Sequence, residues 1–253
     1  MKFSTLFCIF IRSFFLEIVW NYERMQNVGF TFSIIPYLKK LYKDKELLAK
    51  RIKAHFTFFN THPYFASIIL GITARLEERY SKDEISSEEI IRNRNMLAGP
   101  VAAIGDRLIW SSWRVFCSVL TCGYFLLHGR NFYNEANIWI GVLSFLLIYN
   151  LVGNLPIRFL GVYFGYNYSS QIIEKISKFA PQKLVKKIRI LGVVLLLIIS
   201  FFYSISLVDS KREVIIFWLN LLISILISRK FSWVVTIIFL FIANFLLYWL
   251  VIR

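Results

Sequence analysis

The chain has 253 residues, of which 57% are hydrophobic and 18% aromatic, with a formal net charge of +15. An ordinary soluble domain contains about 45–50% apolar residues, so this composition and a mean hydropathy of +0.59 favour an integral membrane protein. The basic residues cluster beside apolar segments, as they do in the cytoplasmic loops of membrane proteins. We therefore expect no nucleic-acid partner.

The N-terminal segment, residues 1–38, predicts a hydrophobic or amphipathic helical region. Its start, Lys2 followed by an apolar run, is that of a secretory signal peptide, but Arg12 and Glu17 interrupt the run and no cleavage site follows. Polar side chains at membrane depth usually face a bundle interior or an aqueous cavity. The polar positions in this segment are Glu17, Asn21, Glu23, Arg24, Gln26 and Asn27. An amphipathic helix facing the cytoplasm explains them equally well.

The chain contains two clusters of basic residues. Pro36 limits the preceding helix, and a cytoplasmic helix with Lys39, Lys40, Lys43, Lys45, Lys50, Arg51 and Lys53 is expected to follow. The second cluster contains Lys175, Lys178, Lys183, Lys186, Lys187 and Arg189. Anionic lipid headgroups attract such clusters by about 1 kcal/mol per basic residue near the surface, so anionic lipid is an expected partner.

A turn at Asn60-Thr61-His62-Pro63 is expected to end one helix and begin another over residues 64–76, with Asn60 or Thr61 as its cap. His62 is expected to fix this turn by a local hydrogen bond. The new helix ends in Glu77 and Glu78, which are either exposed at a helix end or functional.

Residues 95–116 place Gly99-Pro100 and Gly105-Asp106 inside an apolar stretch, which predicts a broken membrane helix lining a cavity. Asp106 lies at the break. Its carboxylate could accept hydrogen bonds from sugar hydroxyls, and Trp110 and Trp113 offer flat faces for a sugar ring. A helix-capping role for Asp106 is the alternative.

The C-terminal part predicts membrane-spanning helices. A span needs about 20 apolar residues, and residues 190–208 and 231–252 meet this requirement without a charged residue. Residues 115–127, 138–152 and 214–228 are too short unless flanking residues extend the helix. Gly161 and Gly165 have the small-xxx-small spacing that permits close helix contact.

Three sequence blocks, in order and suitably separated, resemble the IID subunit of the mannose/fructose/sorbose family of the sugar phosphotransferase system. They are RSFF with WNYERMQN-x-GF from Arg12 to Phe30, FFNTHP with the following Ala66, Leu70, Gly71, Glu77 and Glu78, and GP-x-A-x-IGD with Trp110. A weaker fourth match, Tyr149-Asn150 and Gly161 to Tyr166, extends the resemblance to about residue 168.

The resemblance implies an all-α, polytopic helical membrane protein of the bacterial cytoplasmic (inner) membrane, with amphipathic and broken or re-entrant helices. Its expected parts are residues 1–38, a core at 39–170 with the sugar site, and a C-terminal transmembrane bundle at 171–253. A IIC subunit would share the path of a hexose-type sugar in a hetero-oligomer. The cytoplasmic phosphocarrier domains IIA and IIB would be further partners, and IIB would phosphorylate the sugar. The chain itself would carry no catalytic residue, metal or cofactor.

By the same analogy, the residues expected to line or shape the sugar site are Asn60, His62, Glu77, Glu78, Asp106, Trp20, Asn21 and Trp110. The chain departs from the family pattern at Arg107, a cation beside Asp106 that would pair with it if both were buried, and at Ser111-Ser112 and Val115. These departures leave open a second reading, a non-transporting IID-like membrane interaction protein.

Overall fold

The computed structural model describes residues 1–128, 134–172, 174–175 and 180–206, together with the isolated positions 215, 218, 219 and 222. These residues form helices joined by short connections and contain no strand, which confirms the all-α fold class. The α-helices are α1 (Phe3–Arg12), α2 (Asn27–Leu41), α3 (Lys45–Ala54), α4 (Ala66–Tyr80), α5 (Ser87–Gly105), α6 (Arg114–His128), α7 (Glu135–Ile148), α8 (Leu155–Tyr168) and α10 (Pro181–Ser206).

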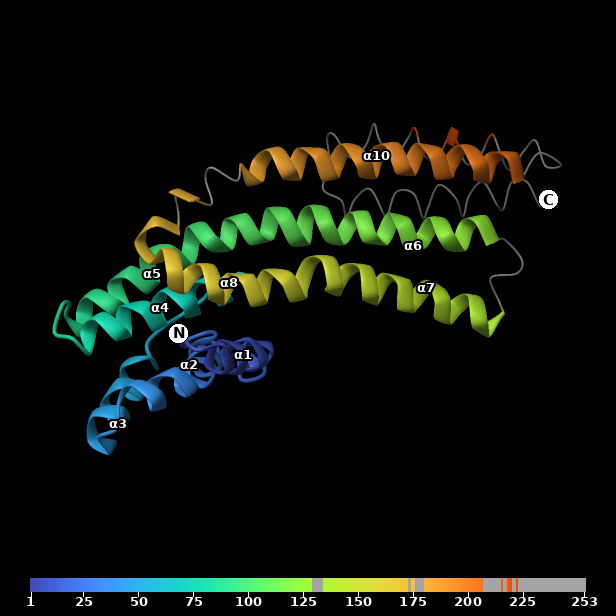
Figure 1. The fold of residues 1–253 in the computed structure, drawn as a ribbon. Coiled ribbons are helices and arrows are strands. Elements are labelled where there is room, and N and C mark those ends of the chain that lie inside the picture. The colour runs from blue at the N-terminus through green and yellow to red at the C-terminus, as the bar shows by residue number, and fades with distance from the viewer. Residues whose placement is uncertain are drawn as a thin grey trace.

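The helices fall into two groups. The long helices α6, α7 with α8, and α10 run beside one another, and α6 lies between α10 and α7 (Figure 1). Helices α1 to α5 gather at one end of this layer, where α4 packs along α8. The candidate site residues lie in this second group, except Asp106 and Trp110, which follow directly after the end of α5.

A single continuous helix extends from Glu135 to Tyr168. Its middle, η4 (Tyr149–Asn154), is a π-helical segment that joins α7 to α8 without a break. The helix has 34 residues and a hydropathy of 1.8, and within the described ranges it is the one helix long and apolar enough to cross a membrane. The window at residues 138–152 is therefore extended by its flanks, as a span requires.

Helix α5 continues into α6 through η2 (Asp106–Trp113), another π-helical segment. The predicted break at Gly99-Pro100 is wrong, because Pro100 lies inside α5. Proline removes one backbone donor, yet the chain stays helical on both sides. At Gly105-Asp106 the helix widens into the π register, with both residues in the right-handed helical region, and does not end. The window at residues 115–127 is thus part of a much longer helix.

Other helix boundaries also differ from the sequence-based expectations. Pro36 lies inside α2, which continues to Leu41. The expected cap at Asn60 or Thr61 is wrong, because α4 begins at Ala66 with Phe65 at its N-cap position. Thr61 donates to the carbonyl oxygen of Ala98 at 2.8 Å. The expected basic helix is α3, capped by Asp44, whose carboxylate accepts from the Leu47 amide. Helix α10 contains the window at 190–208 as far as Ser206, and the window at 231–252 lies outside the described residues.

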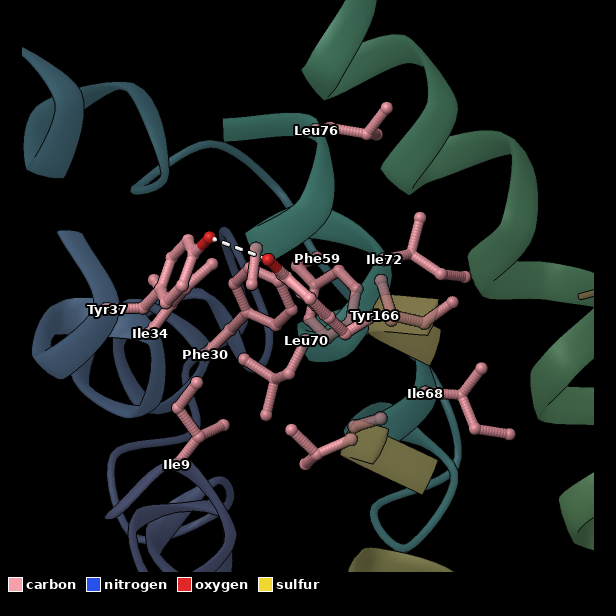
Figure 2. Packing of buried hydrophobic residues seen from close by; sticks show 14 of the residues in the cluster. Ile9, Phe30, Ile34, Tyr37, Phe59, Ile68, Leu70, Ile72, Leu76 and Tyr166 are labelled. Atoms are coloured by element: carbon pink, nitrogen blue, oxygen red, sulfur yellow. Dashed lines mark hydrogen bonds between the residues drawn. The ribbon is translucent and has the colours of Figure 1, made fainter. Parts of the chain in front are cut away.

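The apolar core lies between α2, α4, α8 and the connection before α4. The rings of Phe30 and Phe59 meet with centroids 4.2 Å apart, and both side chains are fully buried. In the same cluster the hydroxyl of Tyr37 donates to that of Tyr166 at 3.4 Å (Figure 2). Helix α8 is therefore joined to the N-terminal helices by apolar packing and by a hydrogen bond.

Helices α4 and α8 cross in backbone contact. A Cβ atom on Gly165 would lie 2.2 Å from the carbonyl oxygen of Ile68, and one on Gly71 would lie 2.3 Å from that of Val162. A Cβ on Gly161 would lie 2.1 Å from Oγ of Ser67. The small-xxx-small pair, Gly161 and Gly165, therefore serves a helix crossing within the chain.

We expect Gly165→Ala to destabilise the protein by about 1–3 kcal/mol, because the added methyl group meets backbone that cannot turn away. The matched control is Gly99→Ala in α5, where a Cβ atom would meet nothing within 4 Å. Alanine favours a helix over glycine by about 1 kcal/mol, so the control should not lose stability. Thermal unfolding in detergent measures both, and equal melting temperatures would contradict the crossing.

Candidate functional site

Glu77 is the centre of a buried ionic cluster. Its side chain is 0% exposed and accepts hydrogen bonds from Nε and Nη2 of Arg51, which is also buried. The Tyr42 hydroxyl donates to Oε2 at 2.8 Å, and Nε2 of His55 lies 2.9 Å from Oε1. The expectation of an exposed helix end is therefore wrong for Glu77, since α2, α3 and α5 cover this part of α4.

The cluster keeps Glu77 ionised. Burial alone would raise the pKa of the Glu77 carboxyl, but hydrogen bonds from His55 and Arg51 outweigh it and lower the pKa to about 2. Burial lowers the pKa of His55. Its Nδ1 atom has no partner in the described structure, and a proton there would be an unsatisfied buried donor. We therefore take His55 as neutral, donating from Nε2 to Glu77.

Glu78 forms a separate, half-buried centre on the neighbouring face of α4. It accepts hydrogen bonds from the hydroxyls of Tyr166 and Tyr37, and from Nη1 of Arg75 at 3.0 Å. The ammonium of Lys82 lies 3.4 Å from its other oxygen. Glu78 thus connects α4 to α2 and α8.

His62 and Trp110 meet at the opposite end of α4. Their ring centroids are 4.7 Å apart, and His62 packs against Gly105 at the start of the π segment. Burial and the charge of Arg158 lower the pKa of His62 to about 4, so the ring is neutral. Its Nδ1 accepts weakly from the Tyr64 amide at 3.3 Å, the local bond expected for this turn. Its Nε2 atom is buried and has no partner among the described residues.

The remaining predicted residues lie in the connections before α2 and α4 and in the π-helical segment η2. Asn60 and Asp106 are exposed, and Asp106 lies on the same helical segment as Trp110, which is 39% exposed. Trp20 is exposed and packs on Tyr22. Asn21 is half-buried and donates to Oδ1 of Asn27 at 3.1 Å, in a connection that pairs with the one containing Asn60 through the bridge between Met25 and Phe59.

The predicted site therefore divides into two groups. The first turn of α4 and Glu77 are eleven residues apart, which corresponds to about 17 Å along the helix. His62 and Trp110 form one group, with Asp106 nearby, whereas Glu77 and Glu78 form the other. Asp106 and Arg107 are both exposed, and the described residues include no ion pair between them. Arg107 thus leaves the Asp106 carboxylate free in this structure.

Two buried arginines were missed by the sequence reading. Arg94 donates to the carbonyl oxygens of His55 and Phe58 and to Oγ1 of Thr57, which holds the connection before α4 in place. Arg158, in the long apolar helix, donates to Ser13 and to Oδ1 of Asn154. A charged residue inside an apolar span signals a special role, and this signal could have identified Arg158. Arg94 lies in a polar stretch and has no such signal.

Within the described ranges no group of three His, Cys, Asp or Glu residues is arranged to hold a metal ion. The side chains of His62 and Trp110 can instead offer a ligand hydrogen bonding and ring stacking. A neutral imidazole beside an exposed indole can hold a polar ring-shaped ligand.

Comparison with protein families places the chain in the family of mannose/fructose/sorbose IID components. A model of the PTS system mannose/fructose/sorbose family IID component matches residues 2–210. The mannose-specific EIID component of Escherichia coli (strain K12) is 35% identical over 186 residues, which make up 73% of this chain and 62% of that protein. The fructose permease IID component of Bacillus subtilis (strain 168) is 32% identical over 188 residues, 74% of this chain and 65% of that protein. The chain thus spans less than two thirds of the length of these relatives.

Two solved structures resemble this chain, in agreement with the family match. The cryo-EM structure of the mannose transporter ManYZ with microcin E492 contains a similar chain, with a TM-score of 0.59 and 33% identity over 79% of this chain and 70% of that one. A second membrane protein structure has a TM-score of 0.66 at the same identity and coverage. The likeness extends over most of the described helices.

We expect Glu77→Ala to lower the free energy of unfolding by about 3–5 kcal/mol, because it leaves the Arg51 guanidinium buried and unpaired. The matched control is Glu84→Ala, which removes an exposed ion pair with Arg79 and should change stability by about 0–1 kcal/mol. Denaturant unfolding in detergent measures both variants. Similar losses in the two would show that the Glu77 cluster does not stabilise the fold.

Proposed function

The chain belongs to the mannose/fructose/sorbose family of phosphotransferase IID components, and from this we propose that it is the IID subunit of a sugar permease. With a IIC partner it forms the translocation path for a hexose-type sugar, and IIB phosphorylates the sugar on arrival. The observation that carries the proposal is the shared fold with a chain of the mannose transporter ManYZ at 33% identity. The chain resides in the bacterial cytoplasmic membrane and crosses it more than once.

The chain acts as a non-catalytic member of this complex. Its relatives are named as mannose-specific and sorbose-specific EIID components and as a fructose permease IID component. Phosphoryl transfer belongs to the IIA and IIB domains, and this chain supplies helices and polar contacts to the path. Exposed lysines at the end of α2 and on α3, such as Lys39, Lys40 and Lys53, face anionic lipid headgroups at the cytoplasmic surface.

His62 and Trp110 are the centre of the sugar-facing surface in this proposal, with Asn60, Asp106, Trp20 and Asn21 at its edge. The support is the unpartnered Nε2 of His62, because an unsatisfied buried polar atom is destabilising by about 1–3 kcal/mol. A sugar hydroxyl that reaches it as Trp110 moves aside would remove this penalty. Glu77 and Glu78 shape the site from a distance, since their oxygens already accept bonds within the chain.

The transport function can be tested in a bacterial strain that lacks its own mannose-type permeases. We expect the chain, expressed with its cognate IIC, IIA and IIB partners, to support accumulation of phosphorylated mannose, fructose or sorbose. Omission of either this chain or IIB should abolish it. If the complex assembles and takes up no hexose or amino sugar, the transport proposal is wrong and the non-transporting interaction protein is the better reading.

The site proposal predicts that His62→Ala raises the sugar concentration for half-maximal uptake about fivefold to tenfold, the loss of about one hydrogen bond. His62→Gln, which keeps a polar end, should recover part of the affinity. His128→Ala, at an exposed histidine in α6, is the control and should behave like the parent. Copurification with IIC confirms assembly. Parental uptake kinetics in an assembled His62→Ala complex would show that His62 only packs the turn.

A further inference from the structure

A groove of about 810 Å³ lies between α8, η2 and the first turns of α10. Its walls include Ile104, Leu108, Ile157, Leu160, Phe164 and Leu184. Among all its lining side chains, those of Trp113, Tyr168 and Lys175 carry a polar atom, and that of Lys175 is charged. A sugar needs several converging hydrogen-bond partners, so this groove does not suit the sugar. It suits a long apolar ligand.

Positive charge gathers at one end of the groove. The Lys175 ammonium lies 4.1 Å from the ring centroid of Tyr168, which also lines the groove. On α10, Leu184 and Ile188 face the groove, and the exposed Lys183 and Lys187 precede each of them by one residue. Neighbouring positions on a helix project about 100° apart, so these lysines lie on the side of α10 next to its groove-facing side. The groove thus has an apolar body and a basic rim.

The groove opens along the membrane helix. Residues 152–168 of its lining belong to the long apolar helix Glu135–Tyr168, of which 17% is buried within the chain over its most apolar window. The apolar lining does not favour water in the groove, because a buried water needs two to four polar partners. In a bilayer, hydrocarbon or another protein segment must therefore occupy this space.

We infer that the groove binds an acyl chain of an anionic phospholipid, whose phosphate lies at the rim formed by Lys175, Lys183 and Lys187. Basic pockets between membrane helices on the cytoplasmic side are a known form of anionic lipid site. The one-ended charge distribution matches a phospholipid, which joins a charged head to long apolar tails. A helix of a partner subunit would instead require apolar surface at the rim.

Native mass spectrometry of the detergent-purified complex with IIC tests this inference, with phosphatidylglycerol or phosphatidylcholine as the added lipid. We expect phosphatidylglycerol to be retained preferentially. Lys175→Gln should reduce that preference about fivefold, the effect of one basic residue near a headgroup. Leu160→Trp should reduce retention of phosphatidylglycerol about tenfold, because the indole displaces about two methylene groups. Equal retention of the two lipids by the parent complex would overturn the inference.

The matched control for the groove is Leu197→Trp on α10, at a position that is 47% exposed and does not line the groove. It should retain phosphatidylglycerol as the parent does, and a loss equal to that of Leu160→Trp would contradict a specific site. A second measurement identifies the occupant. A fluorescent label on Leu160→Cys, with the native cysteines replaced by alanine, should be quenched by phosphatidylglycerol with brominated acyl chains. Absence of quenching in the assembled complex would show that protein fills the groove.

Discussion

Where α4 crosses α8, the two backbones touch, because glycine stands at each point where a side chain would separate them. Gly71, Gly161 and Gly165 leave no room for a Cβ atom. The crossing also brings Oγ of Ser67 within 3.2 Å of the Ile157 carbonyl oxygen, a bond between the helices. Van der Waals packing and such bonds drive helix association where both surroundings and surface are apolar. The N-terminal helices thereby acquire a fixed position against the long apolar helix.

Both polar centres depend on that position. At one end of α4, the crossing lets Tyr166 of α8 reach Glu78 and Tyr37. At the other, it holds the His62 turn against η2 and beneath Trp110. A wider separation of α4 and α8 would disrupt both ends together. The group of His62 and Trp110 and the group of Glu77 and Glu78 are therefore mechanically linked, although they are made of different residues.

Buried cations provide the second constraint. Arg51 has a carboxylate partner, whereas Arg94 is bound by carbonyl and hydroxyl oxygens of residues 55–58. Burial lowers the pKa of Arg94 to about 10, which still leaves it charged at neutral pH. A charged guanidinium in a low-dielectric interior needs its full set of acceptors. The backbone of this connection must therefore keep its oxygens turned toward α5, which fixes the chain just ahead of His62.

The sequence alone predicted the helical membrane class, the family and the basic helix, because composition and motif spacing are local properties. It could not predict the burial of Glu77, since Arg51 and His55 are 26 and 22 residues away. The helix limit predicted at Pro36 and the helix break predicted at Pro100 were also wrong. Local signals identify proline as a helix breaker, but α2 and α5 continue through both residues, and each of these helices packs against α4.

The π-helical segment between α5 and α6 has a consequence for how the two halves are aligned. Arg189 of α10 donates to the hydroxyls of Ser111 and Ser112, both within this segment. Each residue of an ordinary helix turns the chain by about 100°, so the loss of a single residue from the α-helical part of α5 would rotate the π-helical segment and α6 by that angle relative to the start of α5. The serines would then point away from α10. In this part of the chain, the number of residues therefore determines which side of α6 faces α10. A deletion here is tolerated less well than a substitution.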